Sequence, residues 1–248
     1  MRDRTPNHDS FLRVDTALFD IGDTLLDASR ISTECLATTV RHLVRAGVIP
    51  HAEQFLARYH DIDNRIQGPA INHLFSDASI VERTFEGAGL PTSLRNVDIF
   101  LALYRSALRK RILRNRRLVE LFDGLHKRGL KLGVVTDGTT AEQTEQLACL
   151  GILERIDACV TSEALGLEKP NAAMFLGALE ALDCKEPGLA VMIGNDLARD
   201  ILGAQQAGLK TVLVTEFHVV AAPGVFPDRM VSSVYETSTL LRKWHDNK

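Results

Sequence analysis

Signatures of disulfide frameworks and zinc sites are absent from this chain of 248 residues. Its four cysteines are scattered and lack the paired spacing of either kind of site. They are Cys35, Cys149, Cys159 and Cys184. We expect them to be reduced, buried thiols of a cytoplasmic protein. A catalytic thiol is the less favoured alternative, because no cysteine follows a predicted strand beside a histidine.

Long apolar runs and a strong excess of one charge are missing as well. No stretch approaches the roughly 20 apolar residues of a membrane-spanning helix. The polar first 13 residues lack the apolar segment of a secretory signal. A net charge of −3 gives no basic field for nucleic acid. We expect neither a membrane nor a nucleic acid as partner, and the sequence carries no signal for an oligomeric state. The basic segment 105–117 is interpreted as a solvated helix face, with a funnel for an anionic substrate as the alternative.

Short apolar runs, in contrast, are present along much of the chain. Five of them are nearly continuous, at residues 15–20, 131–137, 157–163, 189–195 and 210–215. Such runs are typical of strands buried on both faces of a parallel sheet. Helical segments at 141–151, 171–182 and 196–208 separate the last four runs. The alternation predicts an α/β fold with a doubly wound, Rossmann-like parallel sheet, in which ligands bind beyond the carboxyl ends of the strands.

About 110 residues separate the first two predicted strands, far more than the dozen or so that one crossover needs. Apolar residues recur in this insertion at helical spacings of three and four. One such series is Val97, Leu101, Tyr104, Leu108 and Ile112. We therefore predict a helical domain at 28–112, inserted into a core domain made of residues 1–27 and 113–248.

Polar residues cluster where the predicted strands end. They are Asp20 and Asp23 after the first strand, Thr136, Asp137 and Gly138 after the second, Lys169 after the third, and Asn195, Asp196 and Asp200 after the fourth. One acid at a strand end is usually a turn or capping residue. Four groups that converge at one edge of a sheet indicate a functional site instead.

The chemistry of these groups suits a phosphoryl group. Two acids and an amide can hold Mg²⁺, which prefers oxygen ligands. Thr136 and the next two backbone N–H groups open a predicted helix, where anions bind well. Lys169 adds a positive charge. Asp20 is then the candidate nucleophile, which would form an aspartyl phosphate.

The same segments resemble the four motifs of the haloacid dehalogenase-like hydrolases, in order and spacing, over nearly the whole chain. They read FDIGDTLLD, VTDGTTAEQ, SEALGLEKPNAAMF and MIGNDLARDILGAQQAG. The resemblance implies a parallel core sheet, a helical cap inserted after the first motif, and bound Mg²⁺. It also implies that Asp20 is the nucleophile, that Thr136 and Lys169 bind the phosphoryl group, and that the acids of 195–200 hold the metal.

The first motif departs from the family's phosphatase pattern. That pattern has a second aspartate two positions after the nucleophile, as general acid and base, whose backbone carbonyl ligates the metal. Here the position is Gly22, so the carbonyl remains and the proton-transfer side chain is lost. Asp23 follows one place later. In an extended segment it would point away from the side of Asp20, although Gly22 could turn it inward. Asp23 is therefore either a replacement acid and base or a structural acid.

The fourth motif departs as well. Asn195 stands where the family usually has an acidic ligand, and its neutral amide oxygen can still bind a metal. Asp196 could supply the missing charge. Asp200, one helical turn later, is a candidate metal residue and a candidate partner of Lys169 or of a metal-bound water.

We predict a Mg²⁺-dependent phosphatase of a small phosphorylated metabolite. One alternative is a phospho-ligand-binding protein with little or no turnover. Another is a dehalogenase or a phosphonate-cleaving enzyme. The dehalogenases carry an aromatic residue where this chain has Ile21, and the phosphonate-cleaving relatives use a cap lysine, which residues 28–109 lack. Both departures argue against the last alternative.

Overall fold

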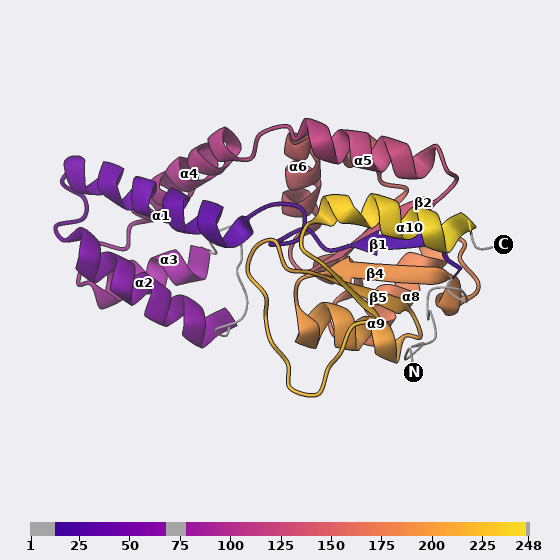
Figure 1. Ribbon diagram of the computed structural model, residues 1–248. Helices are drawn as coiled ribbons and strands as arrows, with labels where there is room; N and C mark the ends of the chain where they lie inside the picture. Colours follow the sequence, from indigo (N-terminus) through magenta and orange to yellow (C-terminus); the bar gives the residue numbers. More distant parts are fainter. Residues whose placement is uncertain (1–12, 68–77, 247–248) are drawn as a thin grey trace, which may run out of the picture. The chain divides into compact units, whose positions relative to one another are not determined.

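The structure is a computed structural model that describes residues 13–67 and 78–246. The chain divides at residues 26/27 and 113/114 into two compact units. Unit 1 is formed by residues from 1–26 and 114–248, and unit 2 by residues 27–113 (Figure 1).

Unit 1 contains a parallel sheet of six strands in the order β3-β2-β1-β4-β5-β6. The strands are β1 (Thr16–Phe19), β2 (Lys131–Thr136), β3 (Ala158–Thr161), β4 (Ala190–Gly194), β5 (Lys210–Val214) and β6 (Arg229–Val231). The predicted α/β fold with a doubly wound parallel sheet is confirmed, and the first five strands fall on the five predicted runs. Strand β6 was not predicted, because three residues with an exposed Met230 form no apolar run.

Helices cover both faces of this sheet. They are α5 (Arg116–His126), α6 (Thr140–Leu150), α7 (Ser162–Leu165), α8 (Ala172–Ala181), the π-helix η4 (Leu197–Ile201), α9 (Leu202–Gln206) and α10 (Thr237–Asp246), with short 3₁₀ turns at Leu153–Arg155, Pro187–Leu189 and Val234–Glu236. Helices α5 and α10 pack together on one face, and α8 and α9 pack together on the other (Figure 1). This arrangement buries the central strands on both sides, as their apolar sequences require.

The central strand β1 aligns the polar segments of the site. Its four residues are fully buried. Phe19, the last of them, lies opposite Val134 of β2 and Ile193 of β4. Because these strands are parallel and in step, Asp20, Thr136 and Asn195 follow at the same edge of the sheet.

In its described residues, unit 2 consists of helices joined by loops. It contains α1 (Ala28–Arg45), α2 (Ala52–Gln67), α3 (Ala78–Gly87) and α4 (Leu94–Arg111). Its core is aromatic: the ring of Phe100 lies 6.1 Å from those of Phe55 and Tyr59 and 6.4 Å from those of Phe85 and Tyr104, measured between centroids. These contacts hold α2, α3 and α4 together.

The end of α4 is joined to α1 by side-chain contacts. Helices α1 and α4 pack along each other. Arg111, the last residue of α4, donates from Nε to Oε2 of Glu34 at 3.2 Å and from Nη2 to the Thr38 hydroxyl at 3.0 Å. Asp27 caps the start of α1 by accepting from the Arg30 N–H. The entry and exit of unit 2 are therefore held side by side.

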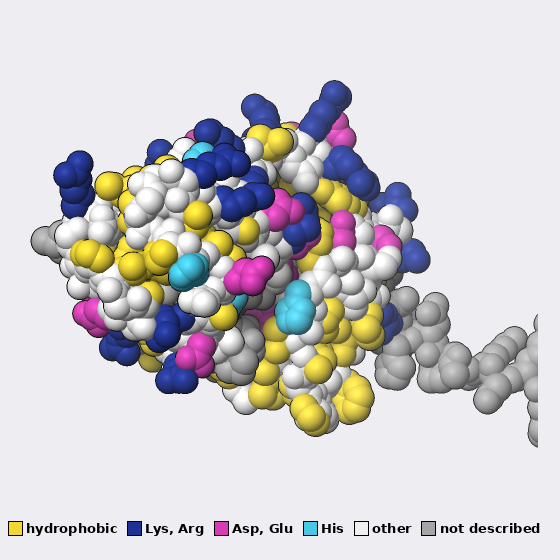
Figure 2. All heavy atoms as spheres, turned by 90° about the vertical axis from the view of Figure 1, so that its left-hand side faces the viewer, with side chains coloured by type: hydrophobic (Ala, Val, Ile, Leu, Met, Phe, Trp, Pro, Cys, Tyr) yellow, Lys and Arg dark blue, Asp and Glu magenta, His cyan; other side chains and the backbone are white. Residues whose placement is uncertain are grey.

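The surface mixes charges of both signs. Figure 2 shows basic, acidic and apolar side chains interspersed on the visible face. In the part of the chain that the structure describes, no helix combines the length and the apolar character needed to cross a bilayer.

Candidate active site

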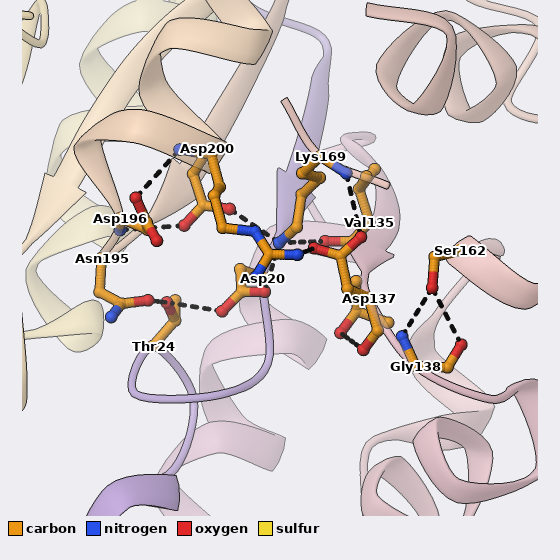
Figure 3. Close-up of polar contacts among 12 residues, drawn as sticks. Asp20, Thr24, Val135, Asp137, Gly138, Ser162, Lys169, Asn195, Asp196 and Asp200 are labelled. Carbon is orange, nitrogen blue, oxygen red and sulfur yellow. Dashed lines mark hydrogen bonds and ion pairs between the residues drawn. The ribbon is translucent and has the colours of Figure 1, made fainter. Parts of the chain in front are cut away.

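Asp20 lies in a buried polar cluster directly after β1 (Figure 3). Its N–H donates to the Ile193 carbonyl at 3.0 Å, which fixes its backbone against β4. Oδ1 accepts from Lys169 Nζ at 2.6 Å, and Oδ2 accepts from the Thr24 hydroxyl at 3.1 Å. Burial raises the pKa of Asp20 to about 7, while the Lys169 charge opposes this rise and Asp200 adds to it. The carboxylate is thus held between a cation on one side and neutral oxygen groups on the other.

Lys169 is buried and uses all three ammonium hydrogens. Nζ donates to Asp20 Oδ1 at 2.6 Å, to Asp200 Oδ1 at 2.7 Å and to the Val135 carbonyl at 3.2 Å. Burial alone would lower the pKa of Lys169, but the nearby carboxylates, first those of Asp20 and Asp200, outweigh burial and raise it. Lys169 therefore stays positively charged. Asp200 thus lies against Lys169, one of the two partners considered for it.

The segment after β4 departs from the ordinary helix expected at 196–208. It begins with the π-helix η4, followed by α9. Asp196 caps η4, because its Oδ1 accepts from the N–H groups of Ala198 at 2.8 Å and Arg199 at 2.9 Å. Asp200 Oδ2 accepts from the Asp196 N–H at 3.1 Å. A side chain at Gly194 would collide with the Asp200 carboxylate, so glycine is required there.

Asn195 directs its amide oxygen to the Thr24 hydroxyl, which also contacts Asp20. Nδ2 donates to the His218 carbonyl at 2.8 Å, which fixes the orientation of the amide. Oδ1 then lies 3.1 Å from the Thr24 hydroxyl, which is 3.1 Å from Asp20 Oδ2. Thr24 was missed by the sequence analysis, although it stands in the first motif four residues after Asp20. Asn195, and not Asp196, shares the Thr24 hydroxyl with Asp20.

This oxygen-rich corner suits a hard cation. Thr24 has one hydroxyl hydrogen for two acceptor oxygens, so one of these acceptors lacks a full hydrogen bond. A carboxylate and an amide oxygen are ligands that Mg²⁺ accepts. Among residues 13–67 and 78–246, no three His, Cys, Asp or Glu side chains are grouped to hold a metal. A cation here would therefore depend on Asp20, on the Asn195 amide and on a backbone carbonyl such as that of Gly22.

The turn after Asp20 corrects our picture of Asp23. Strand β1 ends at Phe19, residues 23–25 form a turn, and an isolated bridge pairs Gly22 with Leu26. The positive φ falls on Asp23 itself, at 54°. The extended conformation that we assumed for this segment is therefore wrong, and strand alternation does not give the direction of the Asp23 side chain. That side chain is buried.

The loop after β2 carries the residues expected to bind phosphate. Thr136 is buried at the end of the strand. The N–H of Gly138, where φ is +123°, donates to the Ser162 hydroxyl at 2.9 Å (Figure 3). The Thr140 N–H, at the start of α6, donates to Glu163 Oε2 at 2.9 Å. Two donors at this helix end therefore have acceptors supplied by α7, which sequence patterns did not reveal.

Asp137 joins this loop to two other segments. Its Oδ1 accepts from the Lys169 N–H at 3.0 Å, and its Oδ2 pairs with Arg199 Nη2 at 2.6 Å. Arg199 is a second residue that the sequence analysis missed, since nothing in the pattern of the fourth motif distinguishes it from a surface arginine. Direct contacts thus connect four of the predicted site residues: Asp20, Asp137, Lys169 and Asp200.

The cysteines are free thiols. None of the four, all of which the structure describes, forms a disulfide, and Cys35 is buried while the other three are half-buried. Burial raises the pKa of Cys159 to about 11, so this thiol is protonated near neutral pH. The geometry does not support a thiol nucleophile at that position.

The chain is similar to known hydrolases over most of its length. A family profile described as haloacid dehalogenase-like hydrolase matches residues 17–214. A glyceraldehyde 3-phosphate phosphatase of Methanopyrus kandleri is 29% identical over 202 residues, which are 81% of this chain and 84% of that protein. A glyceraldehyde 3-phosphate phosphatase of Methanothermobacter thermautotrophicus is 46% identical over 90 residues, which are 36% of this chain and 39% of that protein.

A solved structure shares the fold. It is a HAD-hydrolase of Bacillus subtilis bound to magnesium, which is 22% identical to this chain with a TM-score of 0.68. The superposition covers 92% of this chain and 99% of the other. At this identity the likeness concerns the fold, and the chemistry has to be argued from the residues themselves.

Proposed function

Because the chain belongs to the haloacid dehalogenase-like hydrolases, as its four motifs predict, we propose that it is a Mg²⁺-dependent phosphatase of a small phosphorylated metabolite. The observation that carries this proposal is the environment of Asp20. One carboxylate oxygen contacts the buried ammonium of Lys169, and the other faces Thr24 and Asn195. The phosphatase names of the similar proteins support a phosphate monoester as substrate.

In the proposed reaction Asp20 attacks the phosphorus atom. The ester oxygen leaves with its electron pair, and an aspartyl phosphate forms. Water then attacks this phosphorus, so inorganic phosphate leaves and the Asp20 carboxylate is restored. Lys169 neutralises the charge that develops on the phosphoryl oxygens. Asp200 holds the Lys169 ammonium in place from the opposite side.

A magnesium ion would be held by Asp20, by the Asn195 amide oxygen and by the backbone carbonyl of Gly22. When bound it would supply further positive charge against the phosphoryl oxygens. In this proposal Asp196 acts by capping η4, because its carboxylate accepts from the N–H groups at the start of that helix. Asp200 acts through Lys169, because its carboxylate accepts from the ammonium.

Gly22 limits the leaving groups that the site can handle. No side chain at this position can protonate the departing oxygen, and general acid–base help is typically worth about 10²–10⁴ in rate. We therefore expect measurable turnover of an aryl phosphate, whose oxygen leaves without a proton, and weak turnover of most alkyl phosphates. The same feature supports the second candidate, a phospho-ligand-binding protein with very slow turnover.

The test is a phosphatase screen of an aryl phosphate and a panel of phosphorylated metabolites, with Mg²⁺ and with EDTA. We expect turnover in the presence of Mg²⁺ and none in EDTA. Asp20→Asn should bind inorganic phosphate and hydrolyse nothing, because an amide cannot form the aspartyl phosphate. Full activity in a purified, folded Asp20→Asn protein would refute the mechanism. Phosphate binding without turnover in the unmodified protein would favour the second candidate.

A further inference from the structure

Arg199 forms a largely buried ion pair beside the site. Its Nη2 lies 2.6 Å from Asp137 Oδ2, and the two side chains are only 15% and 9% exposed. A second contact, 3.7 Å to Glu168 Oε2, is long, and Glu168 is 65% exposed. Solvent screens such an exposed pair strongly, so the pair with Asp137 is the one that matters.

The Asp137 carboxylate transmits this contact to Lys169. While Oδ2 pairs with Arg199, Oδ1 accepts from the Lys169 backbone N–H at 3.0 Å (Figure 3). The ammonium of the same lysine is fixed by Asp20 and Asp200. Lys169 is therefore held at both ends, by two carboxylates at its ammonium and by one at its backbone.

The position of Arg199 is itself fixed. Its backbone N–H donates to the Asp196 cap at 2.9 Å, and the next residue, Asp200, binds the Lys169 ammonium. One turn of η4 thus sends Asp200 to the Lys169 ammonium and Arg199 to Asp137, whose carboxylate accepts from the Lys169 backbone N–H. Removing the guanidinium would leave the Asp137 carboxylate largely buried without its cation, which favours its reorientation toward solvent.

We propose that Arg199 is a positioning residue that acts through Asp137 to hold Lys169 in the geometry that binds the phosphoryl group. This inference rests on the proposed function. Arg199 does not need to touch the substrate. It orients Asp137, Asp137 orients the backbone of Lys169, and the ammonium then meets Asp20 and the phosphoryl oxygens.

The test is a double-mutant cycle on Arg199→Gln and Asp137→Ala, with inorganic phosphate as the probe. Affinity is measured by calorimetry, and kcat and KM are measured on an aryl phosphate. Arg199→Gln should weaken phosphate binding at least about fivefold in the unmodified protein, within the range found for contacting residues. In the Asp137→Ala background it should change the affinity less than about twofold, because nothing remains to be positioned. Arg116→Gln is the matched control, since Arg116 is 91% exposed in its pair with Glu120 and should leave the affinity unchanged.

Two results would overturn the inference. An equal loss in both backgrounds would mean that Arg199 acts by its charge alone. A lower thermal midpoint with unchanged phosphate affinity and kcat would mean that it only stabilises the fold. If Asp137→Ala fails to fold, Arg199→Lys is compared with Arg199→Gln at high salt, which screens distant charges more than buried ion pairs. Arg199→Lys keeps an ion pair with Asp137 and should bind phosphate better than Arg199→Gln. Equal phosphate affinities of the two variants would refute the inference.

The test of Arg199 can fail independently of the test of the proposed function. An unmodified protein that binds phosphate and hydrolyses no ester contradicts the proposed function, while the phosphate affinities still test Arg199. Normal turnover with no effect of Arg199→Gln contradicts the inference alone. A protein that neither binds phosphate nor hydrolyses esters contradicts both.

Discussion

At the scale of single residues, the orientation of the Asn195 amide is set by a hydrogen bond from its nitrogen. Its Nδ2 donates to the His218 carbonyl at 2.8 Å, so the amide oxygen is directed to the Thr24 hydroxyl and toward Asp20. An aspartate at this position would carry charge toward a cation, but it would also place an acceptor oxygen against the His218 carbonyl. The asparagine therefore satisfies the His218 carbonyl with a hydrogen bond that an aspartate could not donate.

Asn195→Asp is expected to change two properties in opposite directions. The added charge should tighten Mg²⁺ binding, because the charge of the ligands sets the affinity for such cations. The lost donor should lower the free energy of unfolding in EDTA by about 1–3 kcal/mol. Calorimetric titration with Mg²⁺ and urea unfolding in EDTA measure both. Unchanged or weaker Mg²⁺ binding in the variant would mean that Asp196 already fills that role or that residue 195 is no ligand.

The backbone conformation of Asp23 limits the substitutions that can test its role. Its φ of 54° lies in the left-handed region, which asparagine tolerates about as well as aspartate. Asp23→Asn therefore removes the charge with little change in backbone or volume. We expect the ratio of alkyl to aryl phosphate turnover to stay the same, because the Asp23 side chain is buried in the turn, as a structural acid would be.

The opposite result has a clear signature. If Asp23 has replaced the missing acid and base, Asp23→Asn will slow alkyl esters selectively and remove one limb of the pH–rate profile. Gly22→Asp, which restores the family's usual carboxylate, is the complementary variant. It should raise alkyl-ester rates within the range of about 10²–10⁴ that acid–base catalysis provides.

At the scale of elements, η4 places three polar side chains within five residues. Asp196 caps it, Arg199 reaches Asp137, and Asp200 reaches Lys169. π-turns inside helices occur frequently at functional sites. The cap explains why Asp196 points along the backbone and does not join Asn195 at the Thr24 hydroxyl.

Two substitutions separate capping from metal binding at Asp196. Asp196→Asn keeps a capping oxygen and removes the charge, so Mg²⁺ affinity and stability should both change little. Asp196→Ala removes the cap and should lower the free energy of unfolding by about 0.5–2 kcal/mol. Urea unfolding and Mg²⁺ titration give the two values. Loss of Mg²⁺ affinity in Asp196→Asn would identify Asp196 as a ligand.

Sequence patterns predicted the elements better than the contacts between them. The five apolar runs located β1 to β5, because strands buried on both faces must be apolar throughout. The strand β6 is too short for such a signal, and the π-helix η4 has the same apolar spacing as an ordinary helix. Asp20 and Lys169 were predicted because each follows a strand end.

The bonds of Thr24 and Arg199 could not be predicted in the same way. Arg199 meets Asp137 across 62 positions of sequence, and Thr24 meets Asn195 across 171. Such pairs depend on the exact packing of η4 and of the turn after β1, which leaves no periodic trace in the sequence. The extended conformation assumed for Asp23 failed for a related reason, since a strand pattern does not show where the strand stops.

At the scale of the whole molecule, the candidate site draws its residues from unit 1 while unit 2 has an aromatic core of its own. Phe100→Ala should therefore destabilise unit 2 by about 3–5 kcal/mol, as truncation of a buried aromatic ring usually does. Binding of Mg²⁺ and inorganic phosphate should persist. Scanning calorimetry and ligand titration of the same sample check both.

Phe122→Ala is the matched control in unit 1. The Phe122 ring is buried and lies 4.9 Å, between centroids, from that of Phe19, the residue before Asp20. This variant should lose stability and ligand binding together. If Phe100→Ala also abolished ligand binding, the two units would have to unfold as one.

The ion pair between Arg111 and Glu34 has a consequence for the gene. Because the last residue of α4 is held against the first turns of α1, the two ends of residues 27–113 lie together. A unit of this kind needs only two junctions in its host, and insertion is best tolerated where chain ends are close. The coding segment is therefore suited to exchange as one piece: recombination that replaces residues 28–113 would leave all four motifs of the hydrolase unchanged.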